Sequence, residues 1–473
     1  MKSGAKISGE SSSVSWWPIA AIVVLVLACI FVSGQVGLKV PSPIIASRYL
    51  NPSYALDGGA SSATWYCEGF GGALNGIDYQ DILLSNPLDK SVGGYFDMTL
   101  SNGKRLQSAF TLPKKSFQVA DIVQRAGQPA EMIEVHLFEG GVVVTLAEHI
   151  ASGWITSGCS PMGAQSVLLP GGSTNTTSQY YLAISNSGPS VAVVNISIFS
   201  TNGYLEPPSI QGLVVASGDT LLENLSIAAP DENISAVTVS AMQGSPNIVA
   251  AMADVSAGVT TLSSGSPYVG NNAIISATEG LVSETESITV VNAGESAAKV
   301  SLVPILTSNL VSSPITAMIA PKSTWVVNSS TFASTFGGSP HGYVVKSNVA
   351  VTAFRTISNS YGVQCSFGVP FGTNTASGAI TFFQLPGQGM LTLLNPSSLN
   401  ERVLVSLLSP QSSEEKNIQI AIQPYSVKVL DLSSTGLESV GYAVQSSGSI
   451  ITEGDMSDSF GNLERFQGTN YEP

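Results

Sequence analysis

The stretch "LLSNPLDKSVGGYFDMTLSNGK", from Leu83 to Lys104, decides the fold, because the chain repeats its outline a hundred residues later. The second version, "AISNSGPSVAVVNISIFSTNGY", runs from Ala183 to Tyr204. Most residues differ between the two copies, but the asparagines at 86 and 102 have counterparts at 186 and 202 with the same spacing. A pattern that keeps its turn residues while the rest changes indicates a repeated structural unit.

Four asparagines mark this repeat, and each one ends a short apolar run. They follow one another at intervals of 100, 106 and 103 residues: Asn86, Asn186, Asn292 and Asn395. Asparagine suits such a place because it accepts turn geometry and bonds to nearby backbone. After each of them apolar and polar residues alternate, which is typical of a half-buried strand. The asparagines therefore predict a strand, a turn and a second strand in every copy.

Each copy holds about six or seven short strands in about a hundred residues, which matches an immunoglobulin-like sandwich. The sequence predicts an all-β fold: a tandem array of about four immunoglobulin-like antiparallel β-sandwich units after one N-terminal transmembrane helix. The alternative is a β-propeller in which each unit supplies two fused blades. We expect stiff units joined end to end, which would span on the order of 100–150 Å.

The spacing of the repeat also predicts the boundaries. We expect a cytoplasmic tail at 1–15, a transmembrane helix at 16–34, a linker at 35–63, β-sandwich repeats at 64–160, 161–266, 267–366 and 367–458, and an acidic tail at 459–473.

The amino terminus predicts the compartment. An uncharged apolar run from Trp16 to Val32 is long enough to cross a hydrocarbon layer of about 30 Å. The two lysines of the leader outweigh its one glutamate, which places the leader in the cytoplasm. The sequence therefore predicts a single-pass protein of the cell membrane with its C-terminal domain extracellular. The alternative is a signal peptide cleaved near Val32-Ser33-Gly34.

The charge limits the partners. The formal net charge is −14, and charged residues make up 11 % of the chain against roughly 25 % in an average globular protein. Nucleic acid is not expected as a partner, because phosphates are bound by clustered Lys and Arg. The expected partners are the membrane, through the N-terminal helix, and cell-wall polysaccharide or other envelope proteins.

The cysteines predict one cross-link. Cys67 precedes the first repeat asparagine and Cys159 follows the last hairpin of the same unit, so a disulfide between them would join its two ends. Closing a loop of about a hundred residues contributes up to about 4–5 kcal/mol. Cys365 occupies the matching place after the third unit, without a partner ahead of it. We expect a buried free thiol there, with an intermolecular disulfide as the alternative.

Chemistry-bearing motifs are absent from the sequence. It contains no nucleophile elbow, no His-Glu-x-x-His, no Cys-x-x-Cys and no phosphate-binding loop. Three histidines in two different units argue against a metal site or a catalytic triad. The sequence thus predicts no catalytic residue, no cofactor and no metal. A pair of carboxylates could still serve a glycosidase, and the first unit supplies Asp78, Asp81, Glu131, Glu134 and Glu148.

Two functions follow from these observations. The preferred one is a non-catalytic, membrane-anchored extracellular β-repeat protein of the cell envelope with a structural, adhesion or assembly role. The alternative is a cell-surface glycan-binding protein or glycoside hydrolase, which would present exposed aromatic rings to sugars. The candidates for such a glycan platform are Trp65, Tyr66, Trp154 and Trp325, with Phe70 and Tyr361 beside them.

Short motifs add a resemblance to a known family. "TWYCEG" ahead of "LLSNP", then Cys-Ser-Pro, then "LLPGGS" ahead of the next asparagine strand, resembles a family of secreted or membrane-anchored actinobacterial proteins of unknown function. The resemblance implies a membrane segment followed by repeated strand–Asn-Pro–strand units, and it carries no catalytic residues. This chain departs from the family in having Val167-Leu168-Leu169 where an aromatic residue usually precedes Pro-Gly-Gly.

Overall fold

The computed structural model describes part of the chain. It describes residues 62–467 apart from 72, 75, 152, 243–246, 257–258, 268, 279–284, 308–312, 329–330, 332–339, 359–362, 371–386, 409–416, 433–440 and 459–462. The chain divides into two units, 1–47 and 48–473, and every described residue belongs to the second. The predicted cytoplasmic tail and transmembrane helix lie outside the described residues. Within the described part, no helix combines the length and the apolar character needed to cross a membrane.

The first unit consists of two four-stranded antiparallel sheets. The order in one sheet is β1 (Ala63–Glu68), β6 (Ala130–Leu137), β3 (Val92–Leu100) and β4 (Arg105–Leu112); in the other it is β5 (Ser116–Asp121), β2 (Tyr79–Asn86), β7 (Val143–Ile150) and β8 (Gly153–Gly158). A short helix, α3 (Ile122–Ala126), follows β5. The chain passes back and forth between the two sheets, which is the topology of a sandwich. A propeller blade would instead take its strands in succession from one segment.

The other units vary this plan: the second has sheets of four and five strands, the third has eight strands connected through one long strand, and the fourth has sheets of four and three strands. The second has β9 (Ser166–Ser173), β10 (Ser178–Asn186), β11 (Ala192–Ser200), β12 (Gly203–Leu205), a 3₁₀ turn η1 (Pro208–Ile210), β13 (Leu213–Val215), β14 (Thr220–Asn224), α4 (Leu225–Ala228), β15 (Asn233–Ala241), β16 (Ile248–Ser256) and β17 (Val259–Ser264). The third has β18 (Gly270–Thr278), β19 (Thr285–Asn292), β20 (Ala298–Leu306), β21 (Ile315–Ile319), β22 (Ser323–Asn328), β23 (His341–Ser358), β24 (Val363–Phe367) and β25 (Val369–Pro370). The fourth has β26 (Gly387–Asn395), β27 (Glu401–Leu408), β28 (Asn417–Ile422), β29 (Ser426–Asp431), β30 (Gly441–Ser446), β31 (Ile451–Asp458) and β32 (Leu463–Gln467).

These elements confirm the predicted all-β array of four antiparallel β-sandwich units. One detail differs at the carboxyl end, where the sequence predicted an acidic tail over 459–473. Leu463–Gln467 instead forms β32, which pairs antiparallel with β31 and adds a strand to the fourth unit. The strand was hard to predict because its two apolar residues, Leu463 and Phe466, are three positions apart and do not alternate with polar ones.

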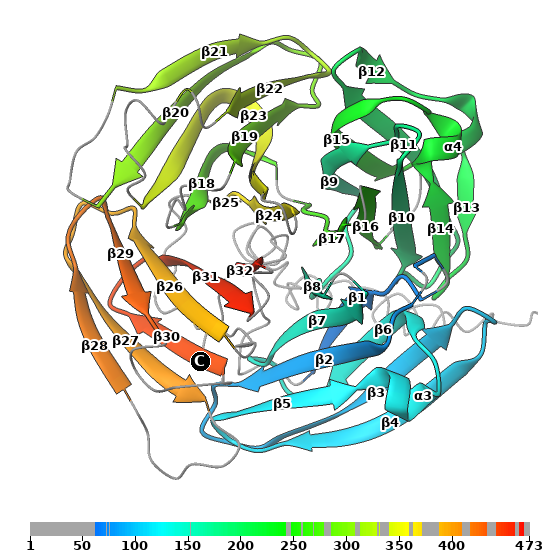
Figure 1. Ribbon diagram of the computed structural model, residues 1–473, viewed down its shortest axis with the longest axis horizontal. Coiled ribbons are helices and arrows are strands. Elements are labelled where there is room, and N and C mark those ends of the chain that lie inside the picture. The colour runs from blue at the N-terminus through cyan, green and yellow to red at the C-terminus, as the bar shows by residue number, and fades with distance from the viewer. Residues whose placement is uncertain are drawn as a thin grey trace, which may run out of the picture. The chain divides into compact units, whose positions relative to one another are not determined.

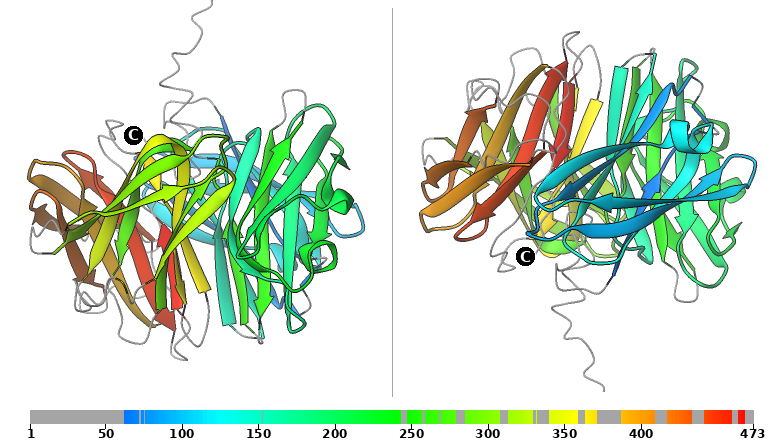
Figure 2. Two further views of the ribbon diagram at one scale, coloured as in Figure 1. Left: turned by 90° about the horizontal axis from the view of Figure 1, so that it is seen from above. Right: turned by 90° about the horizontal axis from the view of Figure 1, so that it is seen from below.

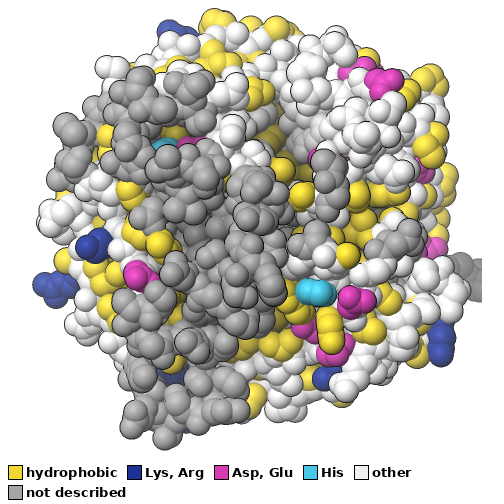
Figure 3. Space-filling model, viewed as in Figure 1, with side chains coloured by type: hydrophobic (Ala, Val, Ile, Leu, Met, Phe, Trp, Pro, Cys, Tyr) yellow, Lys and Arg dark blue, Asp and Glu magenta, His cyan; other side chains and the backbone are white. Residues whose placement is uncertain are grey.

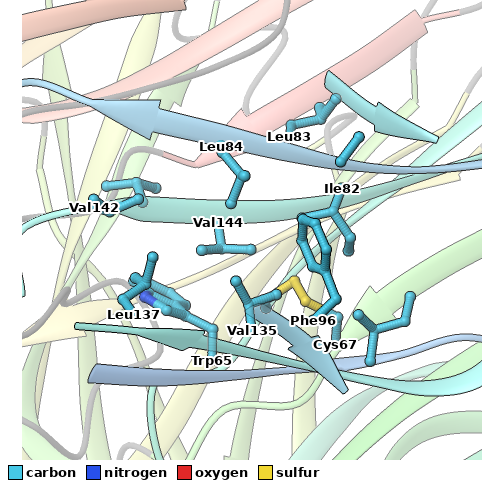
Figure 4. Packing of buried hydrophobic residues seen from close by; sticks show 14 of the residues in the cluster. Trp65, Cys67, Ile82, Leu83, Leu84, Phe96, Val135, Leu137, Val142 and Val144 are labelled. Carbon is cyan, nitrogen blue, oxygen red and sulfur yellow. A yellow bond between two sulfur atoms is a disulfide. The ribbon is translucent and has the colours of Figure 1, made fainter. Parts of the chain in front are cut away.

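Buried and half-exposed residues alternate along the strands, so that the apolar side chains of each unit point into a core between its sheets. On β3, Phe96, Met98 and Leu100 are buried, while the residues between them are half-exposed. In the first unit Trp65 and Val144 are among the side chains that face one another across this core (Figure 4). Such alternation fixes the register, because a slip of one residue would turn every apolar side chain outward.

The predicted disulfide is present in the first unit. Cys67 on β1 is bonded to Cys159, which follows β8, and both residues are buried. Tyr66 and Ser160 also exchange backbone hydrogen bonds of 2.8 Å next to it. The bridge therefore ties the first strand of the unit to the segment that leaves its last strand.

The four repeat asparagines are fully buried and share one set of hydrogen bonds. In each unit the side-chain Nδ2 donates to the carbonyl four residues later and to a carbonyl 27 to 29 residues later, and Oδ1 accepts from the amide two residues later. For Asn186 the partners are Ser190 O at 2.7 Å, Val215 O at 3.0 Å and the Gly188 amide at 3.0 Å. One side chain thus stabilises two turns: the turn that directly follows the asparagine, and the later turn that in the first unit connects β4 to β5.

The later of these two turns has the same backbone geometry in the four units. Lys115, Lys322 and Tyr425 each adopt a positive φ, of 46°, 51° and 47°, and Gly218 has a φ of 71° at the corresponding turn of the second unit. The amides of the three non-glycine residues donate back to the turn after the asparagine, for example Tyr425 N to Ser397 O at 3.0 Å. This strained backbone is maintained because it satisfies buried polar groups on both connections.

Neighbouring units contact one another in a closed cycle. The inner strand β17 contacts both β8 and β24, and β32 likewise contacts both β8 and β24 (Figure 1). The last strands, in red, lie beside the first unit, in blue and cyan, in Figure 2. Four apolar clusters join the units, from first to second, second to third, third to fourth and fourth to first; they include Phe70 with Ala251, Phe199 with Phe354, Ile274 with Ile451, and Leu408 and Ala443 with the first core.

The expectation of units joined end to end is therefore wrong. In an extended chain the outward faces of the sheets would meet water, but here those faces carry apolar residues that are buried against the next unit. Phe199 is 3 % exposed and Phe354 1 % exposed. Burying this apolar surface favours the compact cycle over an extended array.

Replacing a repeat asparagine tests how much each unit depends on it. We expect Asn186→Ala to lower the free energy of unfolding by about 2–4 kcal/mol, because it leaves two buried carbonyls and one buried amide without their partner. Urea unfolding followed by circular dichroism measures the change. The control is Asn202→Ala at an exposed turn, with an expected loss under about 0.5 kcal/mol. Equal losses in the two variants would contradict the role given to Asn186.

Candidate functional site

The structure does not gather the four predicted glycan-platform residues. Trp65 is wrong as a candidate, because it is 1 % exposed and packs inside the first core on the inward face of β1 (Figure 4). Phe70 is likewise buried, at the contact between the first and second units. Strand alternation explains the correction, since Trp65 and Cys67 lie on the same side of β1 and the disulfide sets that side inward.

Tyr66 and Trp325 are half-buried at separate places. Tyr66 lies on the other face of β1, beside Glu134 and within hydrogen-bonding distance of the Ser187 side chain of the second unit, and burial raises its pKa. Trp325 lies on β22 and packs against the core of the third unit. Tyr361 lies outside the described residues. Trp154 is also half-buried and packs against the first core, but it has two further rings beside it.

Trp154 belongs to an aromatic ladder that crosses three strands. Tyr79 on β2 lies opposite His149 on β7, which lies opposite Trp154 on β8. The ring centroids are 5.9 Å apart for Tyr79 and His149, 5.2 Å for His149 and Trp154, and 6.3 Å for Tyr79 and Trp154. Cross-strand neighbours of this kind share one face of the sheet. We call these three residues the aromatic ladder.

The ladder lies on the outward face of the sheet, where Tyr79 is exposed while His149 and Trp154 are half-buried, and it has a carboxylate beside it. Tyr79 is 52 % exposed, and His149 Nδ1 lies 3.8 Å from the carboxylate of Asp78. Figure 3 shows histidine, acidic and apolar side chains together on the viewed face. Exposed rings can stack on the apolar face of a sugar, and a carboxylate and an imidazole can bond to its hydroxyls. Sequence reasoning missed Tyr79 and His149 because only the strand register brings them to Trp154.

A second set of polar residues is buried at one end of three of the sandwich cores. It occupies the position six residues before the repeat asparagine: Gln80, Tyr180 and Glu286. Gln80 donates to Glu148 Oε1 at 2.7 Å and exchanges two bonds with the backbone of Ala130. The Tyr180 hydroxyl donates to Pro170 O at 2.6 Å. Glu286 Oε2 lies 2.8 Å from His341 Nε2. These bonds connect the two sheets of a unit.

Two glutamates of the first unit are buried with one oxygen each lacking a hydrogen-bond partner among the described residues. They are Glu68 and Glu148. Burial raises the pKa of Glu68 to about 8 and that of Glu148 to about 7, the latter against the opposing effect of the Gln80 hydrogen bond. Raised values favour the neutral acid, which needs fewer partners than a carboxylate. In the described part of the chain, no three His, Cys, Asp or Glu residues come together as a metal site would require.

The buried acids predict a pH dependence of stability. A folded-state pKa above the unfolded value means that the folded chain holds the proton more tightly, so this stabilisation is complete below about pH 4 and is lost as the pH rises through about 7 to 8. We expect the free energy of unfolding to fall between pH 5 and pH 8, and Glu148→Gln to flatten that fall. Urea titrations across this range measure it.

The matched control for this prediction is Asp89→Asn, whose carboxylate is exposed beside Lys115. It should keep the wild-type slope. If Glu148→Gln also kept that slope, the buried acid would not be its source.

A buried ion pair connects the third and fourth units. Arg355 on β23 pairs with Glu453 on β31, and both side chains are almost fully buried, at 1 % and 0 % exposed. Arg355 Nη1 also donates to Ser276 O at 2.6 Å, and the Ser276 hydroxyl donates to Glu453. Removing one member of such a pair leaves an uncompensated buried charge. The network therefore orients the two units rather than offering an open site.

Cys365 lies elsewhere than the sequence placed it. It is inside β24, opposite Thr356 on β23, whereas Cys159 follows the end of β8. It carries a free thiol, as the preferred prediction had it, but the residue is half-buried rather than buried. Burial raises its pKa to about 12, so the thiol stays protonated at neutral pH. A protonated, largely enclosed thiol is a poor nucleophile.

Comparison with known proteins found a family model that matches part of the chain. Residues 142–303, about a third of the chain, match the model of a "Family of unknown function (DUF5719)". No curated protein matches the chain. A solved structure titled "Crystal structure of tetra-tandem repeat in extending region of large adhesion protein" aligns with 88% of this chain and 98% of that chain, at 10% sequence identity and a TM-score of 0.11. A likeness at that TM-score supports no conclusion about fold or function.

Proposed function

We propose that the protein is a non-catalytic component of the cell envelope, anchored in the membrane by residues 16–34, whose four sandwich units form an extracellular head with a structural, adhesion or assembly role. The observation that carries the proposal is the closed cycle of units, because it turns four small sandwiches into one broad scaffold. The Cys67–Cys159 disulfide supports it as well, since disulfides persist in oxidising compartments outside the cytoplasm.

The actinobacterial origin implied by the sequence motifs belongs to the same proposal. Residues 142–303 match a family of unknown function, as the resemblance implied. The compact cycle changes the mechanical role that the sequence suggested. The four contacting units then act as one compact scaffold rather than as a long spacer.

Fractionation of cells tests the anchor. The full chain with a C-terminal tag, expressed in the organism that encodes it, should stay in the membrane fraction after an alkaline wash. Protease added to wall-stripped cells should remove the tag. A variant lacking residues 1–34 should lose membrane association. Recovery of the full chain as a soluble protein, or a tag protected from external protease, would contradict the anchored extracellular head.

Glycan binding is a second candidate, and the aromatic ladder is the observation that favours it. The half-exposed Tyr79 ring could stack on a sugar, while Asp78 and His149 supply hydrogen-bonding groups beside it. Ring stacking and hydrogen bonding to a single sugar each contribute little affinity. Tight binding would therefore need contacts with several sugars along a polymer.

A retention assay on purified cell-wall polysaccharide tests this candidate. We expect the full chain to be retained and Tyr79→Ala to bind about tenfold more weakly, which corresponds to about 1.4 kcal/mol of lost ring contact. Phe138→Ala, which removes a 60 % exposed ring at another place on the first unit, serves as the control. No retention of the unaltered chain, or equal losses in the two variants, would remove the ladder from consideration.

A further inference from the structure

The fourth unit carries a groove that neither the aromatic ladder nor the contacts between units explain. It extends over β27, β28 and β30 and encloses about 530 Å³. This volume falls within the range of about 300–1,000 Å³ that is usual for sites of small ligands. Its lining consists of Arg402, Val403, Leu404, Gln419, Ile420, Ala421, Gln445 and Ser446.

The register of the three strands arranges these residues in rows. Leu404 lies opposite Gln419 on one side and Gln445 on the other, so two amides flank one apolar side chain. In the adjacent row Arg402 lies opposite Ala421. These five residues share the outer face of the sheet, because Val403 and Val405 between them point into the core. We call them the amide–arginine row.

The polar groups of this row have no partners among the described residues. Arg105, Arg125 and Arg355 each have a hydrogen bond, an ion pair or a ring contact. Arg402 is exposed, and in the described part of the chain its guanidinium has no such contact. The side-chain amides of Gln419 and Gln445 are exposed in the same way. Exposed donors that line one open groove are available to a ligand.

Charge selects the kind of ligand. The protein as a whole carries a net charge of −14, yet the described residues that line the groove include an arginine and neither an aspartate nor a glutamate. Arginine presents a planar fork of donors that matches a carboxylate in a bidentate way. Amide groups donate to and accept from hydroxyls, and Leu404 and Ala421 offer an apolar floor.

We propose that the groove binds an acidic polysaccharide, with a uronic-acid carboxylate on Arg402 and sugar hydroxyls on Gln419 and Gln445. The apolar face of the ring then lies over Leu404. The inference rests on the proposed extracellular location, where such polymers occur. It names a ligand class and a site that the aromatic ladder does not supply.

Calorimetric titration of the purified full chain in detergent tests the proposal. The probes are an oligomer of galacturonic acid and the same oligomer with its carboxyl groups reduced to alcohols. We expect the acidic oligomer to bind, its affinity to fall as salt is raised, and the neutral form to bind at least tenfold more weakly. Arg402→Glu should lower the affinity for the acidic oligomer at least tenfold, and Arg402→Lys should lower it less.

Two controls separate this site from other effects. Lys428→Glu makes the same change of charge on β29, in the other sheet of the fourth unit, and should leave affinity unchanged. Phe138→Ala, which removes an exposed ring of the first unit outside the ladder, should also leave it unchanged. Thermal unfolding shows whether each variant is folded; if Arg402→Glu is not, Gln445→Ala is used, with an expected loss of about threefold.

The outcomes are distinct. Absence of binding to the acidic oligomer, equal binding of the neutral form, or full affinity in folded Arg402→Glu would overturn the inference. Each of these leaves the fractionation test of the membrane anchor untouched. Conversely, a chain that binds the acidic oligomer but is recovered from the cytoplasm would retain the site and lose the proposed location.

Discussion

The whole architecture depends on one buried asparagine side chain in each unit. At that point a strand ends, a turn begins and a second connection passes close by, and all three present backbone groups that water cannot reach. An asparagine amide can donate twice and accept at the same time, so it satisfies them together. Aspartate would lose the donors, and glutamine would place its amide one carbon too far. The chemistry of a single side chain therefore explains why these four positions stay fixed while most of the surrounding residues differ.

A second constraint operates at the opposite end of the core, six residues earlier. There the chain uses glutamine, tyrosine and glutamate in three successive units, each bonded to a different partner. Any of these side chains can join the two sheets, so the position tolerates change where the asparagine does not. The first three sandwiches are thus held at both ends by buried polar bonds, with an apolar core between them. Such bonds oppose sliding of the sheets, which apolar packing alone resists weakly.

Sequence reasoning reached the strands, the four units and the disulfide because those features depend on local patterns. Alternation along β3 and the spacing of the asparagines are readable without knowing what lies nearby in space. The cycle of units was not readable, because apolar residues such as Phe199 and Phe354 on outward faces look the same whether they meet water or a neighbour. The aromatic ladder also required the register of three strands, and Trp65 was misjudged because its direction depends on which side of β1 faces the core.

The contact between the fourth unit and the first has a consequence for biosynthesis. Leu408 and Ala443 complete an apolar seam with residues that leave the ribosome some three hundred positions earlier. The first unit therefore keeps one face uncovered until nearly the whole polypeptide has been synthesised. Truncated chains lack the fourth unit and leave this apolar face exposed, which favours their aggregation or degradation. The order of synthesis therefore determines how long the apolar face of the first unit stays exposed.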